Sequence, residues 1–404
     1  MMSFPPVKEQ IDHIKRNTVE IIPEDELVKK IEKSIKENKP LRIKLGCDPS
    51  RPDLHIGHGV VLQKLRDFQD LGHKAVLIIG DFTAMIGDPS GKSKTRPALT
   101  LEETRINGKT YFEQASRILL EKDLEIRYNS EWLDKMTFSD VIKLSSKYTV
   151  MQILERDDFT KRMASKTPIS LHELLYPLSQ AYDSVAVQSD VELGGTDQKF
   201  NLLVGRAIQE AYGQESQCIV TCELLEGTDG VEKMSKSLNN AICFTDSPKD
   251  IFGKSMSIPD KLIYKYYSLG TMLNDAELAE VKKELDDPAT NPRNLKVRLG
   301  YELVKKYYDE ESARYAQNEF ETIFVKKEIP DDIPEFKLEA KEVKLVTIIK
   351  ENNMAATSSE AIRLIKQGGV TIDGEKITDE KYIVKAEKDF VLKVGKRKFL
   401  RVKV

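Results

Sequence analysis

Short apolar runs alternate along the first half of the chain with segments whose apolar residues recur at helical spacing. The runs 41–47, 74–81 and 217–223 are short and largely apolar, as strands buried in a parallel sheet are. Residues 60–71 have the spacing of a helix, and residues 1–40 also read as helical. This alternation predicts a doubly wound, parallel-sheet α/β domain of the Rossmann-like kind, with ligands at the carboxyl ends of its strands.

The junction between the first run and its helix carries two histidines, His55 and His58, where the helix begins. A helix N-terminus offers free backbone N–H groups and the positive end of the helix dipole, which suit a phosphate. Gly57 lets a ligand lie flat against the backbone, and both imidazoles can donate hydrogen bonds to phosphate oxygens. Histidines at a helix start are more often structural, and a zinc site is a weaker alternative because no third ligand is obvious nearby.

A second candidate segment holds two lysines, Lys233 and Lys236, among small residues on a loop that follows a glycine. Such a cationic arm can close over a triphosphate and meet the charge that develops at its α-phosphorus. The alternative is a solvated lysine turn, which a lone K-x-x-K pattern would favour.

Another loop, 82–93, looks like a phosphate loop, but Ile86 stands where the Walker A pattern needs glycine, so a P-loop NTPase is disfavoured.

A third candidate segment places unusual polar residues on one helix face. Tyr176, Gln180 and Asp183 are spaced i, i+4 and i+7, and this set is odd for a core stripe. An exposed polar face is the common alternative, and Pro177 weakens the prediction of a continuous helix.

Composition narrows the class of protein. Hydrophobic residues at 40% and charged residues at 32% are typical of a soluble globular protein, and 404 residues predict two or three domains. No run of 18 apolar residues predicts a membrane span, and residues 1–10 lack an apolar signal core. The cysteines form no CxxC pattern, so we expect reduced thiols in a cytoplasmic protein: Cys47, Cys218, Cys222 and Cys243.

Charge is distributed unevenly. Residues 341–404 carry 15 Lys and Arg against 9 Asp and Glu, a net +6, whereas residues 1–340 carry 48 against 57, a net −9. A basic tail on an acidic body suggests a polyanionic partner.

The second half of the chain also has predictable elements. Residues 248–327 read as helical, and residues 328–340 read as a Pro- and acid-rich linker. In the tail we expect a capped helix near 358–367, a strand at 370–372 and a half-buried strand over 390–404.

Taken together, the histidine junction and the lysine loop resemble the paired signatures of class I aminoacyl-tRNA synthetases, and the whole chain is similar to the bacterial tyrosyl-tRNA synthetases. The resemblance implies that ATP and L-tyrosine form tyrosyl-adenylate and that the tyrosyl group passes to the 3′ end of tRNA(Tyr). It implies a catalytic domain over 1–247, whose insertion around 110–190 makes a homodimer, and an anticodon-arm domain over 248–327. Residues 341–404 resemble an RNA-binding domain of a small-subunit ribosomal protein.

The resemblance also assigns roles at the tyrosine site. Asp183 accepts a hydrogen bond from the phenol, and Tyr176, Gln180, Thr83 and Asp88 lie at the amino group. Gln198 lies near the carboxylate. At one position the chain departs from many members of the family, which have a tyrosine where this chain has Lys44. Lys44 could pair with Asp183 or donate a hydrogen bond to the phenol oxygen.

Phosphate and RNA sites follow from the same resemblance. Catalysis is expected from His55, His58, Lys233, Lys236, Lys92 and Arg96. ATP is expected to contact Asp48, Ser50, Gly57, Gly194, Asp197, Lys236 and Ser237. Mg²⁺ arrives with the nucleotide, and neither a dedicated metal site nor a tightly bound cofactor is expected. RNA phosphates are expected to meet Arg363, Lys366, Lys396, Arg397 and Lys398.

Two rival interpretations remain at this point. A tryptophanyl enzyme would share the scaffold, but Asp183 suits a phenol better than an indole pocket. A non-catalytic RNA-binding protein would keep the basic tail beside an inactive synthetase-like domain, and the intact histidine and lysine pairs argue against it.

Overall fold

The computed structural model describes residues 4–49, 51–89, 99–323, 333–338, 342–385, 388–395 and 398–404. The chain forms two units, Met1–Ala313 and Arg314–Val404. Five residues with expected roles lie outside the described residues: Ser50, Lys92, Arg96, Lys396 and Arg397. Within the described ranges, no helix has both the length and the apolar character that spanning a membrane requires.

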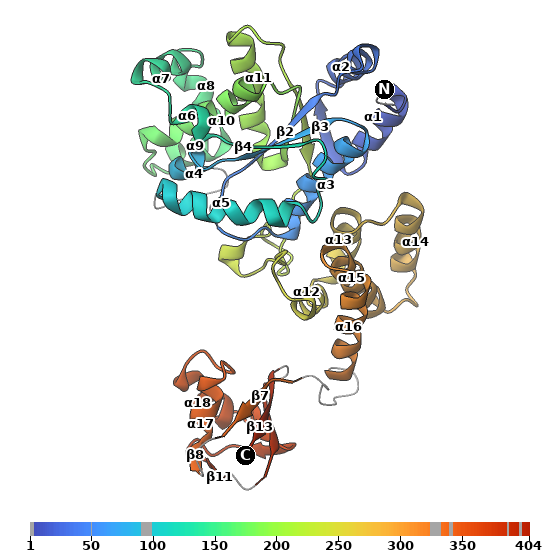
Figure 1. Ribbon diagram of the computed structural model, residues 1–404, viewed down its shortest axis with the longest axis vertical. Helices are drawn as coiled ribbons and strands as arrows, with labels where there is room; N and C mark the ends of the chain where they lie inside the picture. Colours follow the sequence, from blue (N-terminus) through green and yellow to red (C-terminus); the bar gives the residue numbers. More distant parts are fainter. Residues whose placement is uncertain are drawn as a thin grey trace. The chain divides into compact units, whose positions relative to one another are not determined.

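A six-stranded sheet in the order β1-β6-β5-β2-β3-β4 runs through the first unit, with helices on both sides (Figure 1). Its parallel strands are β2 (Arg42–Cys47), β3 (Lys74–Ile79), β4 (Leu124–Tyr128), β5 (Val191–Gly195) and β6 (Cys218–Cys222). The buried apolar runs of the sequence form β2, β3 and β6, so the predicted doubly wound α/β class is confirmed.

One strand of this sheet lies where the sequence predicted only helix. β1 (Thr18–Ile22) pairs antiparallel with β6 and separates α1 (Val7–Lys15) from α2 (Glu24–Glu37). Its sequence, TVEII, is rich in β-branched residues, and its pairing with β6 comes from tertiary structure, which local helical periodicity does not report. The prediction of helix throughout residues 1–40 was therefore wrong at this strand.

Helices connect the strands of the sheet. α3 (Ile56–Asp70) joins β2 to β3, and α4 (Thr83–Ile86) and α5 (Leu101–Ala115) lie between β3 and β4. Between β4 and β5 the chain forms α6 (Ser130–Leu133), α7 (Phe138–Ser145), α8 (Val150–Leu154), α9 (Asp157–Ala164) and α10 (Leu171–Val187). α10 continues through Pro177, and α11 (Lys199–Ala211) joins β5 to β6.

Helices also follow the lysine loop, as the sequence predicted. They are α12 (Pro248–Ser255), α13 (Ile263–Gly270), α14 (Asp275–Asp286), α15 (Pro292–Tyr307) and α16 (Glu310–Glu321). Asn274 caps α14 and Asn291 caps α15 by accepting hydrogen bonds from first-turn N–H groups, which have no partner inside the helix. Residues 248–313 belong to the first unit.

The second unit contains a five-stranded sheet in the order β10-β9-β12-β13-β7 and a two-stranded sheet of β8 (Glu342–Lys344) and β11 (Ile383–Lys385). The larger sheet comprises β7 (Glu335–Lys337), β9 (Val370–Ile372), β10 (Glu375–Ile377), β12 (Phe390–Val394) and β13 (Lys398–Lys403). Two helices, α17 (Leu345–Glu351) and α18 (Ser358–Lys366), help to form its apolar core.

The last residues form two strands, where the sequence predicted one strand over 390–404. β12 and β13 pair antiparallel as a hairpin. Apolar and basic residues alternate on both sides of the turn, so the pattern alone does not mark the break. Gly395, at a φ of 65°, follows β12 in a conformation that glycine adopts without steric cost.

Candidate active site

The order of the strands indicates where a ligand is expected to bind. From β2 the chain proceeds outward through β3 and β4, and it then returns to place β5 on the other side of β2. In open α/β sheets, the crevice at the carboxyl ends of the strands where the order reverses is the usual binding site. Residues that follow β2 and β5 therefore belong to the candidate site.

The segment that carries His55 and His58 and the lysine loop are the two candidate phosphate-binding signatures. They are far apart in sequence, and backbone hydrogen bonds join the first to the segment that follows the second. The N–H of Ile56 donates to the carbonyl of Ile242 over 3.0 Å, and the N–H of Phe244 donates to the carbonyl of Leu54 over 2.9 Å. The segment that follows the lysine loop thus pairs with the start of α3, and His55 faces Cys243 as a bridge partner. This pairing places both signatures at one edge of the sheet.

The two histidines are partly buried and packed ring on ring. The rings of His55 and His58 stack with centroids 3.8 Å apart, and Nδ1 of His58 accepts from the N–H of His55 over 3.2 Å. Burial lowers the pKa of His58 to about 4 and the pKa of His55 well below its ordinary value, with the His58 and Lys233 charges adding to the effect on His55. Both rings are therefore neutral at pH 7, and the acceptor role of the His58 Nδ1 leaves its proton on Nε2 as a donor.

The lysine loop is held by ion pairs in which the lysines are exposed and the carboxylates are partly buried. Lys233 Nζ lies 2.8 Å from the Asp197 carboxylate, and Lys236 pairs with Asp53. Buried Met234 anchors the loop, while Ser237 Oγ lies 2.8 Å from Ser235 Oγ. Exposed ion pairs contribute little net free energy, so either lysine can exchange its carboxylate for a phosphate at small cost.

A buried carboxylate lies on the site-facing side of α10. Asp183 accepts from Trp132 Nε1 over 2.8 Å and from Asn129 Nδ2 over 3.3 Å. Burial raises the pKa of Asp183 to about 7, against the lowering effect of the Lys44 charge and the two donors. Sequence reasoning missed Asn129 and Trp132, although their position directly after β4 at the carboxyl edge of the sheet was an available signal.

Residues expected at the amino group of tyrosine occur in two hydrogen-bonded groups. Asp48, expected at ATP, accepts from Thr83 Oγ1 over 2.7 Å and from Tyr176 OH over 2.9 Å. A second group centres on Asp88, which accepts from Gln198 Nε2 over 2.8 Å and from Arg156 over 3.0 Å. Arg156 is a further residue that the sequence did not single out.

Lys44 occupies a different position from the one the sequence suggested. Its Nζ lies 2.8 Å from Glu192 Oε1, and the two side chains are 0% and 1% exposed. The suggested ion pair between Lys44 and Asp183 is therefore wrong, because the ammonium group of Lys44 binds the Glu192 carboxylate that faces it from the neighbouring strand.

Two glycines after β5 allow close approach of backbone and side chains. A Cβ on Gly194 would lie 3.0 Å from the Cβ of Gln198, and one on Gly195 would lie 2.7 Å from Asp197 Oδ1. These short distances show why the turn into α11 uses glycine, and they set Gln198 and Asp197 beside the end of β5.

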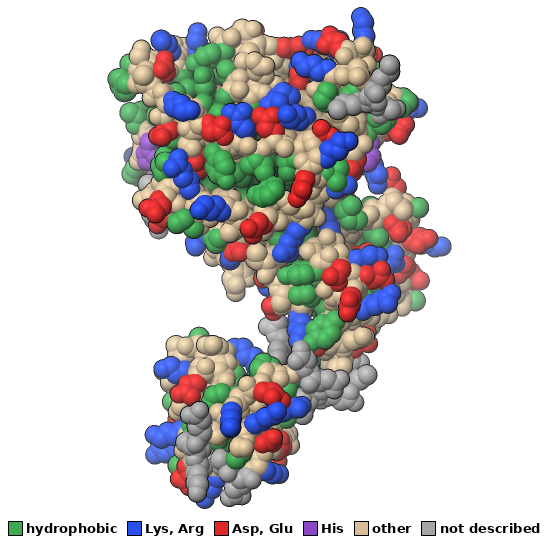
Figure 2. Space-filling view, in the orientation of Figure 1, with side chains coloured by type: hydrophobic (Ala, Val, Ile, Leu, Met, Phe, Trp, Pro, Cys, Tyr) green, Lys and Arg blue, Asp and Glu red, His purple; other side chains and the backbone are tan. Residues whose placement is uncertain are grey.

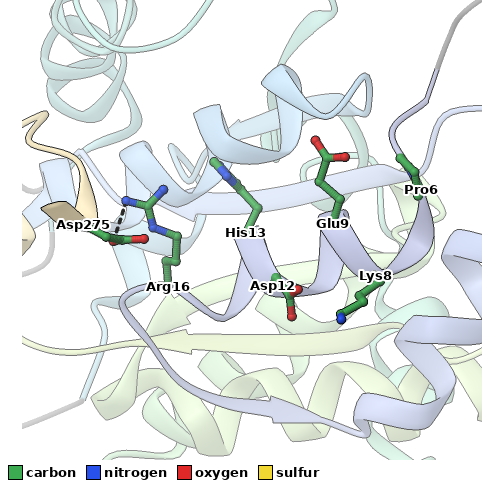
Figure 3. A pocket seen from close by; sticks show the side chains of 7 residues that line it. All are labelled: Pro6, Lys8, Glu9, Asp12, His13, Arg16 and Asp275. Carbon is green, nitrogen blue, oxygen red and sulfur yellow. Dashed lines mark ion pairs between the residues drawn. The ribbon is translucent and has the colours of Figure 1, made fainter.

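An open hollow elsewhere on the first unit has no part in this arrangement (Figure 3). α1 lines most of it, and Arg16 forms a 2.8 Å ion pair with Asp275 of α14 at its edge. The hollow shares no residue with the segments after β2 and β5, and it is lined by Pro6, Lys8, Glu9, Asp12, His13, Arg16 and Asp275.

Comparison with known families agrees with this geometry. A family model for the class I tRNA synthetases of tryptophan and tyrosine matches residues 36–325, and an S4 domain model matches residues 343–391. The chain therefore belongs to the class I aminoacyl-tRNA synthetases of the tryptophan and tyrosine family.

Within this family, the full-length relatives define the amino acid. The tyrosine–tRNA ligase of Thermotoga maritima is 55% identical over 98% of this chain and 97% of its own length. The tyrosine–tRNA ligase of Salinibacter ruber is 54% identical over 100% of this chain and 98% of its own. The activity of this chain is accordingly the ligation of tyrosine to tRNA with ATP, and the predicted family, enzyme class and function are confirmed.

Solved structures show the same fold. The tyrosyl-tRNA synthetase of Archaeoglobus fulgidus, solved with L-tyrosine, has a TM-score of 0.62 and 24% identity over 77% of this chain and 100% of its own. A C-terminally truncated mitochondrial tyrosyl-tRNA synthetase of Aspergillus nidulans has a TM-score of 0.63 and 20% identity over 79% of this chain and 96% of its own.

Proposed function

We propose that tyrosine binds at the carboxyl ends of β2 and β5, with its phenol at Asp183 and its ammonium group between Tyr176, Gln180 and Asp88. The observation that carries this proposal is the buried Asp183 carboxylate, which Trp132 and Asn129 hold in place by hydrogen bonds. A buried acceptor that phenylalanine leaves unpaired disfavours that amino acid, a kind of discrimination for which this enzyme family is a standard example.

We propose that Thr83 and Gln198 complete the amino-acid site, with Gln198 near the substrate carboxylate. Thr83 is buried and accepts from Asn129 Nδ2 over 3.0 Å, which ties the amino-group end to the Asp183 end. Asp48 lies between Thr83 and Tyr176. This shared position supports a role for Asp48 at the boundary between tyrosine and ATP.

We propose that activation uses position and charge rather than a protein nucleophile. The tyrosine carboxylate oxygen bonds to the α-phosphorus while the bond from that phosphorus to the bridging oxygen breaks, and pyrophosphate leaves with the electron pair. Neutral His55 and His58 donate hydrogen bonds to the phosphates, and Lys233 and Lys236 meet the developing negative charge. Mg²⁺ would accompany the nucleotide phosphates, and we expect the protein to supply neither a dedicated metal site nor a tightly bound cofactor.

We propose that the adenosine lies along Gly57, Gly194 and Asp197, with Ser237 and Lys236 at the phosphates. Asp197 pairs with Lys233, so the lysine loop and the candidate ribose carboxylate already lie within 2.8 Å of each other. Ser50 remains a proposed ATP contact, and Lys92 and Arg96 remain proposed partners of the leaving pyrophosphate. Transfer of the tyrosyl group to the terminal adenosine of tRNA then releases AMP.

We propose that the second unit binds the phosphate backbone of tRNA(Tyr). Arg363 and Lys366 are exposed on α18, where Lys366 also pairs with Glu380 over 2.8 Å. Lys398 donates to the carbonyls of Asn353 and Met354 over 3.0 and 3.1 Å, so it supports the fold as well. Lys396 and Arg397 remain part of the proposed RNA-binding set.

We propose that the chain forms a homodimer through its insertion around 110–190 and acts in the cytoplasm. Large apolar side chains are exposed there, among them Phe138 at 81% and Leu171 at 78%, and apolar groups gather over α7 and its neighbours in Figure 2. Exposed apolar surface of this extent favours an interface.

We also propose a catalytic domain over 1–247, an anticodon-arm domain over 248–327, a linker over 328–340 and an RNA-binding domain over 341–404.

The experiment that tests the proposed site is ATP–pyrophosphate exchange with tyrosine, phenylalanine and tryptophan in parallel. We expect exchange with tyrosine alone, and a strong loss in Lys236→Ala. Exchange with tryptophan would refute the assignment of Asp183 to the phenol. An undiminished rate in Lys236→Ala would refute the role of the lysine loop.

The proposed dimer is tested separately by light scattering. We expect twice the chain mass of 46.0 kDa for the parent and the monomer mass for Phe138→Asp/Ile142→Asp at micromolar concentration. A parent that stays monomeric would contradict the proposed interface. Val231→Asp, an exposed apolar position outside the insertion, is the control and should leave the dimer intact.

A further inference from the structure

Next to the proposed tyrosine site lies a buried ion pair between Lys44 and Glu192, which was not predicted from the sequence. Lys44 on β2 and Glu192 on β5 face each other in register where the strand order reverses. Their side chains are 0% and 1% exposed, and Nζ lies 2.8 Å from Oε1. Removing two charges from water costs several kcal/mol each, and apolar replacements of a buried pair are often as stable. Stability alone therefore does not account for this pair.

All the donors and acceptors of the pair are used. Lys44 Nζ has three hydrogens, and it contacts Glu192, Ser184 Oγ at 2.8 Å and the carbonyl of Gln180 at 3.0 Å. Glu192 Oε2 accepts from Ser184 Oγ over 3.1 Å and from Gln217 Nε2. The pair thus ties two central strands to the middle of α10, the helix that carries the tyrosine-site residues.

One further contact connects the ion pair to Gln180, a residue of the proposed tyrosine site. Gln180 Nε2 donates to Glu192 Oε1 over 3.3 Å, while Gln180 Oε1 is buried and has no hydrogen-bond partner among the described residues. A carboxylate can only accept, so it selects the amide orientation in which the NH₂ group faces Glu192. The amide oxygen then faces away from Glu192 as an acceptor, which suits an ammonium group.

We propose that the Lys44–Glu192 ion pair is a positioning element for tyrosine recognition, because it orients the Gln180 amide so that its oxygen accepts from the α-ammonium group of the substrate. Lys44 holds the Glu192 carboxylate in place, and Glu192 fixes the orientation of the Gln180 amide. This inference rests on the proposed role of Gln180 in the tyrosine site. It also gives Lys44 a function through Glu192 and Gln180, without contact with the phenol.

The test uses Glu192→Gln, which keeps the shape of the side chain but can donate as well as accept, so that the Gln180 amide is free to turn over. Glu192→Gln alone leaves the charge of buried Lys44 without its partner, which could destabilise the fold. Lys44→Met/Glu192→Gln removes both charges and so avoids this effect. Two ligands are compared by equilibrium binding: L-tyrosine and 3-(4-hydroxyphenyl)propionate, which lacks the ammonium group. Thermal unfolding confirms that each variant is folded.

We expect both variants to weaken tyrosine binding about tenfold or more, as the loss of one charge-assisted hydrogen bond does. Binding of the desamino ligand and the KM for ATP should change less than about twofold, since neither involves the ammonium contact. Unchanged tyrosine binding, or equal weakening of both ligands, would overturn the inference. Loss of folding in both variants would also overturn it, because the pair would then be structural.

Two further variants separate this inference from the proposed function beneath it. If Gln180→Ala leaves tyrosine binding unchanged, the proposed role of Gln180 fails. If Gln180→Ala weakens tyrosine binding but Glu192→Gln does not, only the positioning role fails. Arg162→Met/Glu173→Gln is the matched control, because it neutralises another buried pair that involves α10, 4% and 5% exposed, which has no contact with Gln180. It should lower thermal stability and leave the ratio of the two affinities unchanged.

Discussion

Burial sets the protonation state of the residues that the proposed mechanism uses. The lowered pKa values of His55 and His58 leave both rings neutral at pH 7, so in the proposed mechanism they act on phosphates as neutral donors and the lysine loop supplies the positive charge. For Asp183 burial acts in the other direction and raises the pKa to about 7, whereas only the ionised carboxylate can accept a hydrogen bond from a phenol through either oxygen. The two donors from Asn129 and Trp132 favour that ionised form.

The raised pKa of Asp183 predicts an acid limb in tyrosine activation. We expect kcat/KM for tyrosine to rise between about pH 6 and pH 8 with an apparent pKa of about 7, since kcat/KM reports ionisations of the free enzyme. The folded-state pKa lies above the ordinary value of 3.8, so the stabilising contribution of this group is present at low pH and is lost as pH rises through about 7.

Two variants identify the group behind this limb in a pH series of pyrophosphate exchange. Asp183→Asn should bind tyrosine weakly and show no limb near pH 7. His58→Asn should be slow yet keep the limb, because the pKa of His58 is about 4. A limb that disappears in His58→Asn and persists in Asp183→Asn would reverse the assignment.

At the scale of elements, the start of α3 is supported from the helical region. Phe244 and Tyr307 stack with centroids 4.5 Å apart, and a Cβ on Gly59 would lie 2.6 Å from the Tyr307 hydroxyl. That hydroxyl is buried without a hydrogen-bond partner among the described residues. Arg117 donates to the carbonyl of Phe244 over 2.5 Å, which fixes the segment after the lysine loop. Contacts between α15 and α3 therefore help to hold both phosphate signatures.

This contact predicts a suppressor pair. Gly59→Ala should lower the free energy of unfolding by about 1–3 kcal/mol, because an added methyl group forces the aromatic stack to shift. Tyr307→Phe removes an unpaired buried hydroxyl and should be neutral or stabilising by up to about 1 kcal/mol. In Gly59→Ala/Tyr307→Phe, much of the lost stability should return. Chemical denaturation measures all three, and strictly additive effects would argue against the contact.

Elements were predictable from the sequence where their pattern was local. The buried runs of β2 and β3, the periodicity of α3 and the polar face of α10 all appear in the chain as printed. β1 and the β12–β13 hairpin were not predictable, because the first depends on pairing with a distant strand and the second continues one alternation across its turn. Trp132 and Arg156 escaped for the same reason, since their roles depend on the meeting of segments far apart in sequence.

For the molecule as a whole, activation and RNA binding reside in different units. The proposed tyrosine and ATP residues lie within Met1–Ala313, and the proposed RNA-binding residues lie within Arg314–Val404. Charge follows the same division, because Arg314–Val404 carries 19 Lys and Arg against 16 Asp and Glu, a net +3, whereas residues 1–313 carry 44 against 50, a net −6. The family resemblance supplied the roles, whereas the pairing of Lys44 with Glu192 needed the structure.

This division predicts variants that separate the two activities. Arg363→Glu/Lys366→Glu should raise the KM for tRNA in aminoacylation by about tenfold at low salt, since it replaces two phosphate-binding cations with anions. Exchange of ATP and pyrophosphate should stay at the parent rate. Glu375→Lys adds a cation to the same unit at an exposed position and serves as the reverse-charge control. A parallel loss of exchange in Arg363→Glu/Lys366→Glu would contradict the separation.

In the proposed site, one set of residues binds tyrosine and another stabilises the charge that develops on ATP. Single-turnover formation of tyrosyl-adenylate, with tyrosine concentration varied, measures both in one experiment by giving a dissociation constant and a rate constant. We predict that Lys236→Ala and His58→Asn lower the rate constant about a hundredfold and leave the tyrosine dissociation constant within about threefold, whereas Asp183→Asn mainly raises that dissociation constant. The opposite pattern, with Asp183→Asn slowing chemistry alone or Lys236→Ala weakening tyrosine binding alone, would contradict the account.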